Sequence, residues 1–408
     1  MNQLTTLPSG LRVATRAMPG LETAAIGLYA DAGSRHEPAR LNGLAHLFEH
    51  MVFKGAGGRS AREISEAIED VGGDLNACTD RDGTSFTASV LAEHLPLGLE
   101  LVADLVQRPH LEAADLEREK DVVLQELGEA RDTPNDIIFD DLWSVAFADQ
   151  PLGRPVLGDE ASIEAITTQD LAGWRRGQYR ADSLFLVAAG KVDHDQVVAL
   201  AERHFADLPT GFIDEAEPAR FTGGARVGRA KAEQAHLALA APGPAVLAPD
   251  YFAARFFCDI VGGGASSRLF QQVREERGLA YSVYAQMAPY SDVSLFTVYA
   301  ATARRESAAA AQLIEEVLAD AAATATPREL ERVRTQGRAG LLMSIESPWG
   351  QASYLARQLS LFGRLVEPAE VIAELQAVTL DQVRAAGAAI LAAPRARATI
   401  GFPALRAA

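Results

Sequence analysis

Residues 46–50 read His-Leu-Phe-Glu-His and interrupt an otherwise apolar stretch, residues 44–53. On a helix, residues four apart share a face, so the imidazoles of His46 and His50 would stand one turn apart and could bind one Zn²⁺ ion. Glu49 could then reach a water on that ion, whose pKa zinc lowers toward about 7, and accept its proton as the general base. The pattern is H-x-x-E-H, the reverse of the H-E-x-x-H order.

A catalytic zinc site also needs a third protein ligand and an open position for water. The segment 115–131 is expected to be a helix, and it carries six acids that could supply the ligand: Asp115, Glu117, Glu119, Asp121, Glu126 and Glu129. Spacing alone does not choose among them, although Glu119 and Glu126 are seven apart and share a face. The competing interpretation is a solvated acidic face and two ordinary histidines. Burying such polar residues among apolar neighbours is costly unless a partner satisfies them.

Composition limits the classes of function. The chain has 408 residues, enough for two or three domains, and its net charge of −17 argues against a nucleic-acid partner. The charge suits a basic substrate, or else reflects a solvated acidic surface. Cys78 and Cys258 are far apart, which fits a reducing compartment. With no leader-like N-terminus and no apolar run of about 18 residues, we expect no membrane span and a cytoplasmic protein. Arg far outnumbers Lys, which indicates a bacterial source.

The sequence contains an internal repeat that forms two similar halves. Three pairs of segments match in the same order at offsets of 210 to 214 residues: 25–33 with 235–243, 115–118 with 329–332, and 166–171 with 378–383. Two homologous halves of about 200 residues would produce this pattern. We therefore expect a zinc-binding half at 1–212, a linker at 213–225 and a second half without metal at 226–408. The mixture of short apolar runs and capped helices predicts an α+β class, with a sheet and packed helices in each half.

The repeat also separates chemistry from folding. The positions opposite His46, Glu49, His50, Glu119 and Glu126 in the second half are Arg255, Cys258, Asp259, Val333 and Gly340. The second half keeps the apolar pattern but lacks every proposed zinc residue. The metal chemistry is therefore expected in the first half alone, with one Zn²⁺ per chain.

These residues resemble the pitrilysin-like M16 peptidases, particularly the branch of mitochondrial processing peptidase and its bacterial relatives, over nearly the whole chain. The resemblance implies a mostly antiparallel sheet in each half and a third zinc ligand about 76 residues after the motif, which is Glu126 here. It also implies that Glu119 supports the site. Residues 72–79 are similar to the family's substrate-edge strand, where Asn76 and Ala77 would face the peptide.

In the second half, residues 262–270 and 273–281 are close to family motifs. The resemblance implies that Arg274 and Tyr281 contact the scissile carbonyl region, where both could donate hydrogen bonds to a developing oxyanion. It also implies that Asp136 and Asp140 hold an arginine of the substrate just before the cleavage point.

The function implied is a zinc-dependent endopeptidase that acts on unfolded peptides or presequence-like segments. Peptides that carry Arg or Lys are the expected substrates. The family's closed chamber contains four half-units, so this chain is expected to work as a homodimer, or as a heterodimer with a related inactive subunit. Two alternatives stay open. One is a non-catalytic partner or chaperone subunit, and the other is a zinc hydrolase acting on a non-peptide substrate.

Overall fold

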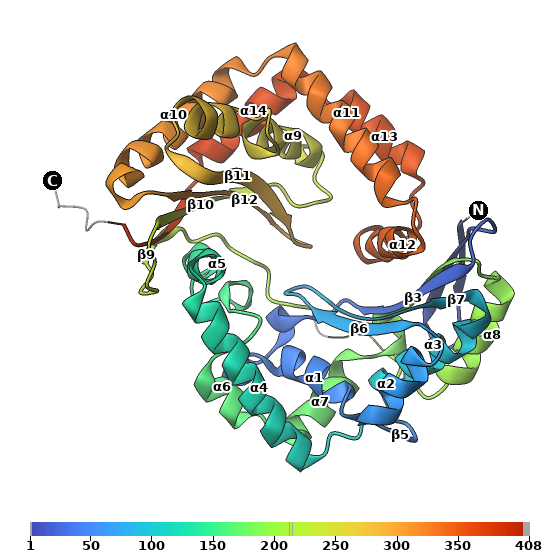
Figure 1. The fold of residues 1–408 in the computed structure, drawn as a ribbon. Coiled ribbons are helices and arrows are strands. Elements are labelled where there is room, and N and C mark those ends of the chain that lie inside the picture. Colours follow the sequence, from blue (N-terminus) through green and yellow to red (C-terminus); the bar gives the residue numbers. More distant parts are fainter. Residues whose placement is uncertain (1, 212, 214, 403–408) are drawn as a thin grey trace. The chain divides into compact units, whose positions relative to one another are not determined.

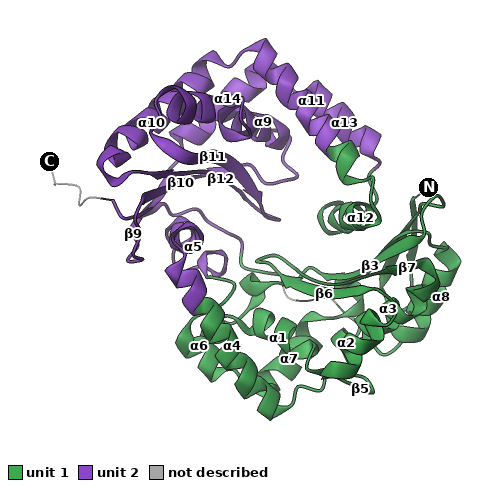
Figure 2. Ribbon diagram, viewed as in Figure 1, with its two compact units in different colours: residues 1–127, 155–217, 341–366 green, residues 128–154, 218–340, 367–408 purple. Residues whose placement is uncertain are grey.

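The computed structural model describes residues 2–211, 213 and 215–402. The chain forms two compact units, each a sheet packed with helices (Figures 1 and 2). Unit 1 contains residues 1–127, 155–217 and 341–366, and unit 2 contains residues 128–154, 218–340 and 367–408. The predicted α+β class is confirmed. Among the described residues, no helix is both long and apolar enough to cross a membrane.

The sheet of unit 1 has six strands. Their order across the sheet is β1 (Asn2–Thr6), β2 (Arg12–Ala17), β8 (Leu184–Gly190), β3 (Thr23–Ala30), β7 (Thr84–Leu91) and β6 (Asp74–Thr79). All neighbours pair antiparallel except β2 and β8, which are parallel. Strand β6 is therefore an edge strand, with one side free of a neighbour in the sheet.

Strand β8 explains why this sheet is covered on both faces. All seven of its residues are buried, and successive side chains of a strand point to opposite faces. Leu184, Leu186 and Ala188 belong to the main core of unit 1. Phe185, Val187 and Ala189 pack instead against α12 (Pro348–Phe362). An uninterrupted apolar run is what such a doubly covered strand requires.

Several helices cover the other face of the sheet: α1 (Leu44–Val52), α2 (Ala61–Glu69), α3 (Leu95–Gln107) and α8 (His194–His204). Further helices complete the unit: α6 (Glu160–Ala165), α7 (Thr168–Gln178) and α4 (Ala113–Asp132) as far as residue 127. The sequence Ser60-Ala-Arg-Glu63 predicts a capping box, and the structure confirms it. The Ser60 hydroxyl accepts from the N–H of Glu63, and the Glu63 carboxylate accepts from the N–H of Ser60.

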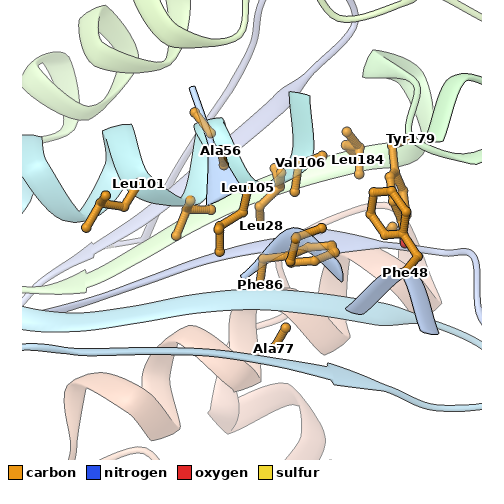
Figure 3. Packing of buried hydrophobic residues seen from close by; sticks show 14 of the residues in the cluster. Leu28, Phe48, Ala56, Ala77, Phe86, Leu101, Leu105, Val106, Tyr179 and Leu184 are labelled. Carbon is orange, nitrogen blue, oxygen red and sulfur yellow. The ribbon is translucent and has the colours of Figure 1, made fainter. Parts of the chain in front are cut away.

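Aromatic rings fix α1 against this core (Figure 3). The ring of Phe48 lies 5.3 Å from that of Tyr179, which in turn lies 5.7 Å edge-on from Phe86 on β7. All three side chains are fully buried. Edge-to-face and tilted contacts of this kind add about 1 kcal/mol each beyond burial. The helix that carries the H-x-x-E-H motif is therefore held rigidly.

Unit 2 has a five-stranded sheet. Its order is β11 (Ala280–Pro289), β12 (Ser294–Thr302), β10 (Ala235–Gly243), β13 (Ala396–Ile400) and β9 (Gly224–Val227). One face packs against α9 (Tyr251–Gly262), α10 (Ser307–Thr324) and α14 (Leu380–Ala392). The opposite face packs against α5 (Pro134–Ala146). Helices α11 (Pro327–Ser344) and α13 (Pro368–Ala377) lie outside this sandwich (Figure 1).

Helices α5 and α12 are repeat equivalents, since Pro134 and Pro348 are 214 residues apart. Each packs on the sheet of the unit that the other half of the sequence mainly forms. The compact units therefore differ from the consecutive ranges 1–212 and 226–408, because residues 128–154 and 341–366 are exchanged. The reason is physical: each sheet has a second apolar face, and the exchanged helix buries it. The change from unit 1 to unit 2 after residue 217 lies within the expected linker, 213–225.

Candidate metal centre

Helix α1 begins without a side-chain cap of its own. Its N-cap residue is Gly43, with a positive φ of 96°. The buried carboxylate of Glu37 takes the place of a cap: it accepts hydrogen bonds from the N–H groups of Gly43 (2.8 Å) and Ala45 (2.7 Å) and from Nδ2 of Asn42 (2.8 Å). A negative group at a helix N-terminus also suits the helix dipole. The first turn of the motif helix is therefore fixed from outside.

The structure brings together His46 and His50, expected as ligands from the motif, and Glu126, expected from the family resemblance. Nε2 of His46 lies 3.8 Å, and Nε2 of His50 lies 3.6 Å, from Oε2 of Glu126 on α4. The three ligand atoms all lie within 4.8 Å of one another. Within the described residues, no other group of three or more histidines, cysteines and acids comes this close. A single cation could therefore be held by all three.

Burial shifts the pKa values of His46 and Glu49. Burial, with a smaller effect of neighbouring His50, lowers the pKa of His46 to about 4, so its approach to Glu126 is not an ion pair. A neutral imidazole offers the lone pair that a metal needs. Burial raises the pKa of Glu49, against hydrogen bonds from Thr79 and the charge of His50. A raised carboxylate pKa suits a residue that must accept and return a proton.

The residues present fit a zinc ion. Two imidazoles and one carboxylate are a donor set that zinc accepts. Two atoms here, Nδ1 of His46 and Oε2 of Glu49, are buried and have no hydrogen-bond partner among the described residues. An unsatisfied buried polar atom costs free energy, so it indicates a ligand or water that completes the site.

Glu119 contacts the ring nitrogen of His50 that faces away from Glu126. Its Oε2 is 3.2 Å from Nδ1 of His50, and its Oε1 is 2.7 Å from Nζ of Lys54. Sequence reasoning named Glu119 from the resemblance but missed Lys54 and the Thr79 contact to Glu49. The signal for Lys54 was its position four residues after His50, one helical turn further along.

Asn76 and Ala77 lie on the edge strand β6, where the resemblance expects the peptide. Their side chains differ: Asn76 is exposed, whereas Ala77 is 7% exposed and packs in the core. The N–H of Ala77 donates to the side-chain oxygen of Asn76 at 2.9 Å. Ala77 could therefore reach a peptide only through its backbone, after the Asn76 amide moves aside.

Four predicted site residues lie in unit 2. Arg274 stands on a π-helical segment, residues 270–276, and its guanidinium carbon lies 4.5 Å from the ring centre of Phe270 and 4.9 Å from that of Tyr281. Tyr281 is 75% exposed. The structure thus brings the predicted Arg–Tyr pair together. Single π-turns within helices are frequent at functional sites.

Asp136 and Asp140 lie one turn apart on α5. The exposed Asp136 is close enough to Tyr284 and Tyr299 to affect both hydroxyls. Burial first, then Tyr284 and Asp136, raise the pKa of Tyr299 to about 12. A carboxylate beside aromatic rings attracts an arginine or lysine side chain, because both groups interact favourably with a positive charge.

The positions opposite the metal residues in the repeat serve packing. On α9, Arg255 pairs with Asp259 at 3.1 Å, and Cys258 is fully buried. Fold and site together define a two-unit α+β protein with a candidate zinc-hydrolase centre in unit 1.

The chain matches two family models. One is described as insulinase, peptidase family M16, and covers residues 12–160; the other is described as the peptidase M16 inactive domain and covers residues 165–336. The chain belongs to peptidase family M16, and the resemblance drawn from the sequence is confirmed.

Curated relatives agree. An uncharacterized zinc protease of Mycobacterium leprae is 36% identical over 388 residues, which are 93% of this chain and 87% of that protein. The beta subunit of the mitochondrial-processing peptidase of Lentinula edodes is 34% identical over 405 residues, 94% of this chain and 86% of that one. Solved structures show the same fold. The peptidase M16 inactive domain from Pseudomonas fluorescens has a TM-score of 0.90 at 23% identity, covering 100% of this chain and 99% of that one.

Proposed function

We propose that this protein is a zinc-dependent endopeptidase that hydrolyses unfolded peptides. The observation that carries the proposal is the convergence of His46, His50 and Glu126, from two helices, beside the half-buried carboxylate of Glu49. Its membership of family M16, whose relatives are named zinc proteases, supports the same reaction class.

Each residue has a role in this proposal. His46, His50 and Glu126 would hold the zinc ion, which supplies a Lewis acid that activates water and polarises the scissile carbonyl. Glu49 accepts the proton of the attacking water on Oε2, the oxygen that has no other partner, and returns it to the leaving amine. The raised pKa of this carboxylate makes it a stronger base, so Glu49 accepts the proton of the water more readily.

Residues outside the zinc centre would bind the substrate. Edge strand β6 would take an extended peptide as an added strand, through backbone hydrogen bonds near Ala77. Arg274 and Tyr281 would donate hydrogen bonds to the oxyanion. Asp136 and Asp140, with the ring of Tyr284 nearby, would favour a basic side chain, and the net charge of −17 favours basic peptides generally.

The working form would be a dimer, either of two identical chains or with a related inactive chain. The resemblance implies four half-units in a complete chamber, and this chain supplies two. One relative is named as a subunit of a processing peptidase, which fits partnership with a second chain.

The test uses Glu49→Gln with zinc analysis and a fluorogenic unfolded peptide. Glu49→Gln is expected to keep about one zinc per chain and to lose at least about 10³-fold in kcat, because the general base is lost while all ligands stay. Glu66→Gln, an exposed glutamate of α2 paired with Arg62, is the matched control and should keep full activity.

One result would refute the proposed peptidase activity, and another would refute only the proposed preference for basic peptides. A zinc-loaded wild type that leaves every unfolded peptide intact would favour a chaperone or partner subunit, or a non-peptide substrate. Equal cleavage of acidic and basic peptides of the same length would remove the proposed preference for basic substrates while leaving the peptidase itself in place.

A further inference from the structure

Lys54 follows the motif helix closely, since α1 ends at Val52. Its Nζ lies 2.7 Å from Oε1 of Glu119, whose other oxygen lies 3.2 Å from Nδ1 of His50. Lysine, glutamate and histidine therefore form a chain of two polar contacts that ends on a candidate zinc ligand. None of the roles assigned so far uses the lysine.

Glu119 depends on these two partners. Its side chain is only 8% exposed, and within the described residues its carboxylate contacts no other cation or donor. A buried carboxylate that loses one of two partners becomes free to turn toward water or the remaining partner. Lys54 is 35% exposed, so its stem crosses the surface while its ammonium group reaches inward.

The orientation of His50 depends on Glu119 in turn. When Nδ1 of His50 donates to the carboxylate, the proton stays on Nδ1 and the lone pair of Nε2 stays available. That Nε2 lies 3.6 Å from Oε2 of Glu126, on the side where the ligands converge. Any device that fixes the Glu119 carboxylate therefore also fixes the ring of a ligand.

We propose that Lys54 is a positioning residue for the metal centre: by holding Glu119 against Nδ1 of His50, it slows the escape of the bound cation. The inference rests on the proposed zinc site. It adds that three residues act in sequence: His50 holds the metal, Glu119 holds His50, and the partly exposed Lys54 holds Glu119.

A purely electrostatic role for Lys54 predicts the opposite change in the rate of zinc release when the lysine is removed. Three carboxylates surround the centre, those of Glu49, Glu119 and Glu126. Removing a nearby positive charge would by itself strengthen the attraction of this cluster for a cation. Loss of positioning speeds zinc release, whereas loss of repulsion slows it, so the direction of the change distinguishes the two roles.

The test is the rate at which the zinc-loaded full chain releases metal to an excess of a chromophoric chelator. Lys54→Met keeps an unbranched stem but has no ammonium group, and its release should be several-fold to about tenfold faster, near the lower end of what a lost supporting contact costs. Lys54→Arg can still reach the carboxylate and should release zinc at close to the wild-type rate. Lys191→Met removes a lysine from a surface pair with Glu22, 2.6 Å apart in unit 1, and should change nothing.

Further measurements keep the result interpretable. The urea midpoint of the metal-free protein should be nearly equal for wild type and Lys54→Met, because methionine keeps the apolar stem and the Glu119 carboxylate can turn toward water. If Lys54→Met fails to fold, Lys54→Gln, which keeps a donor without charge, takes its place and should show a smaller acceleration. Unchanged or slower release from the folded variant would overturn the role of Lys54. A wild type that binds no zinc would instead refute the proposed function.

Discussion

The carboxylate of Glu37 accepts a 2.7 Å hydrogen bond from the backbone N–H of Ala45, in the first turn of the helix that carries both candidate histidine ligands. Glu37 is 3% exposed and also accepts from the N–H of Gly43. Because a glycine N-cap has no side chain to cap the helix, these donors would otherwise be buried without partners. The position of the metal motif therefore depends on a residue outside the motif.

Replacing Glu37 by alanine should destabilise unit 1 by about 3 kcal/mol, because it leaves two or more buried donors unsatisfied. The measurement is urea unfolding of the metal-free protein, followed by tryptophan fluorescence. Glu93→Ala, at a glutamate whose side chain is 75% exposed, is the control and should change the midpoint little. A Glu37→Ala protein as stable as the control would show that α1 is held by its apolar face alone.

The motif and its local structure could be predicted from sequence because the signals are short-range. The i, i+4 spacing of His46 and His50 and the Ser60–Glu63 capping box each depend on neighbours within one turn. The α+β class follows from the mixture of short apolar runs and capped helices. The proposed third ligand is different. The spacing left six acids open, and only the family resemblance pointed to Glu126, whose Oε2 the structure places near the Nε2 atoms of both histidines.

Contacts between separate elements account for what the sequence did not predict. Glu37 and Thr79 contact the motif from other elements, and no pattern in their own neighbourhood marks them. The exchange of α5 and α12 between units is of the same kind. Both helices have an apolar face of similar strength. That face shows that each helix must cover a sheet, but it does not show which of the two sheets.

The ring of Phe270 is expected to hold Arg274 ready for the substrate. The guanidinium carbon lies 4.5 Å from the centre of this ring and 4.9 Å from that of Tyr281. Phe270→Leu keeps an apolar side chain but removes the cation–π contact, worth about 1 kcal/mol, so kcat/KM should fall roughly three- to tenfold. The fall should appear mainly in kcat, because the arginine is proposed to act on the oxyanion.

Peptide hydrolysis by Phe270→Leu should be compared with that by Phe362→Leu, which alters an exposed ring in unit 1 and should behave as wild type. Zinc content and the urea midpoint of both variants check that neither has lost the metal or the fold. If Phe270→Leu kept full kcat, the stacking would be a packing feature of the π-helical segment with no part in catalysis.

An ion pair in unit 2 should make stability depend on pH in acid. Burial alone would raise the pKa of Glu329, but hydrogen bonds from Arg268 and Thr326 outweigh it and lower that pKa to about 2. Arg268 also contacts Asp320 at 2.8 Å, and its contacts with Glu329 are 2.7 and 2.8 Å. The folded state thus binds a proton at Glu329 less readily than the unfolded state, whose pKa is near 4.5.

The direction of the pH dependence follows from this difference between the folded and unfolded pKa of Glu329. Stabilisation by the ionised Glu329 is complete above about pH 4.5 and is lost as the pH falls toward about 2. Arg268→Met should therefore lower the urea midpoint most near neutral pH, and the gap to wild type should narrow as the pH is lowered below 4.5. Arg305→Met, at an arginine whose side chain is 85% exposed, serves as the control. A gap that stays constant down to pH 3 would mean that packing of the Arg268 stem, and not the charge pair, stabilises this region.

In the proposed dimer, Arg274 of one chain is expected to reach the zinc centre of the other chain. In a dimer with a shared site, a chain carrying His50→Ala still offers its own Arg274, and a chain carrying Arg274→Ala still binds zinc. Mixing the two inactive variants under conditions that exchange subunits should then restore activity, up to about a quarter of wild type, because half the dimers are mixed and each has one complete site. Each variant alone should stay inactive. Size-exclusion chromatography must show that mixed dimers form, for example with one variant tagged. Mixed dimers without activity would mean that each chain completes its own centre with its own Arg274, and the arginine would then belong to a site within a single chain.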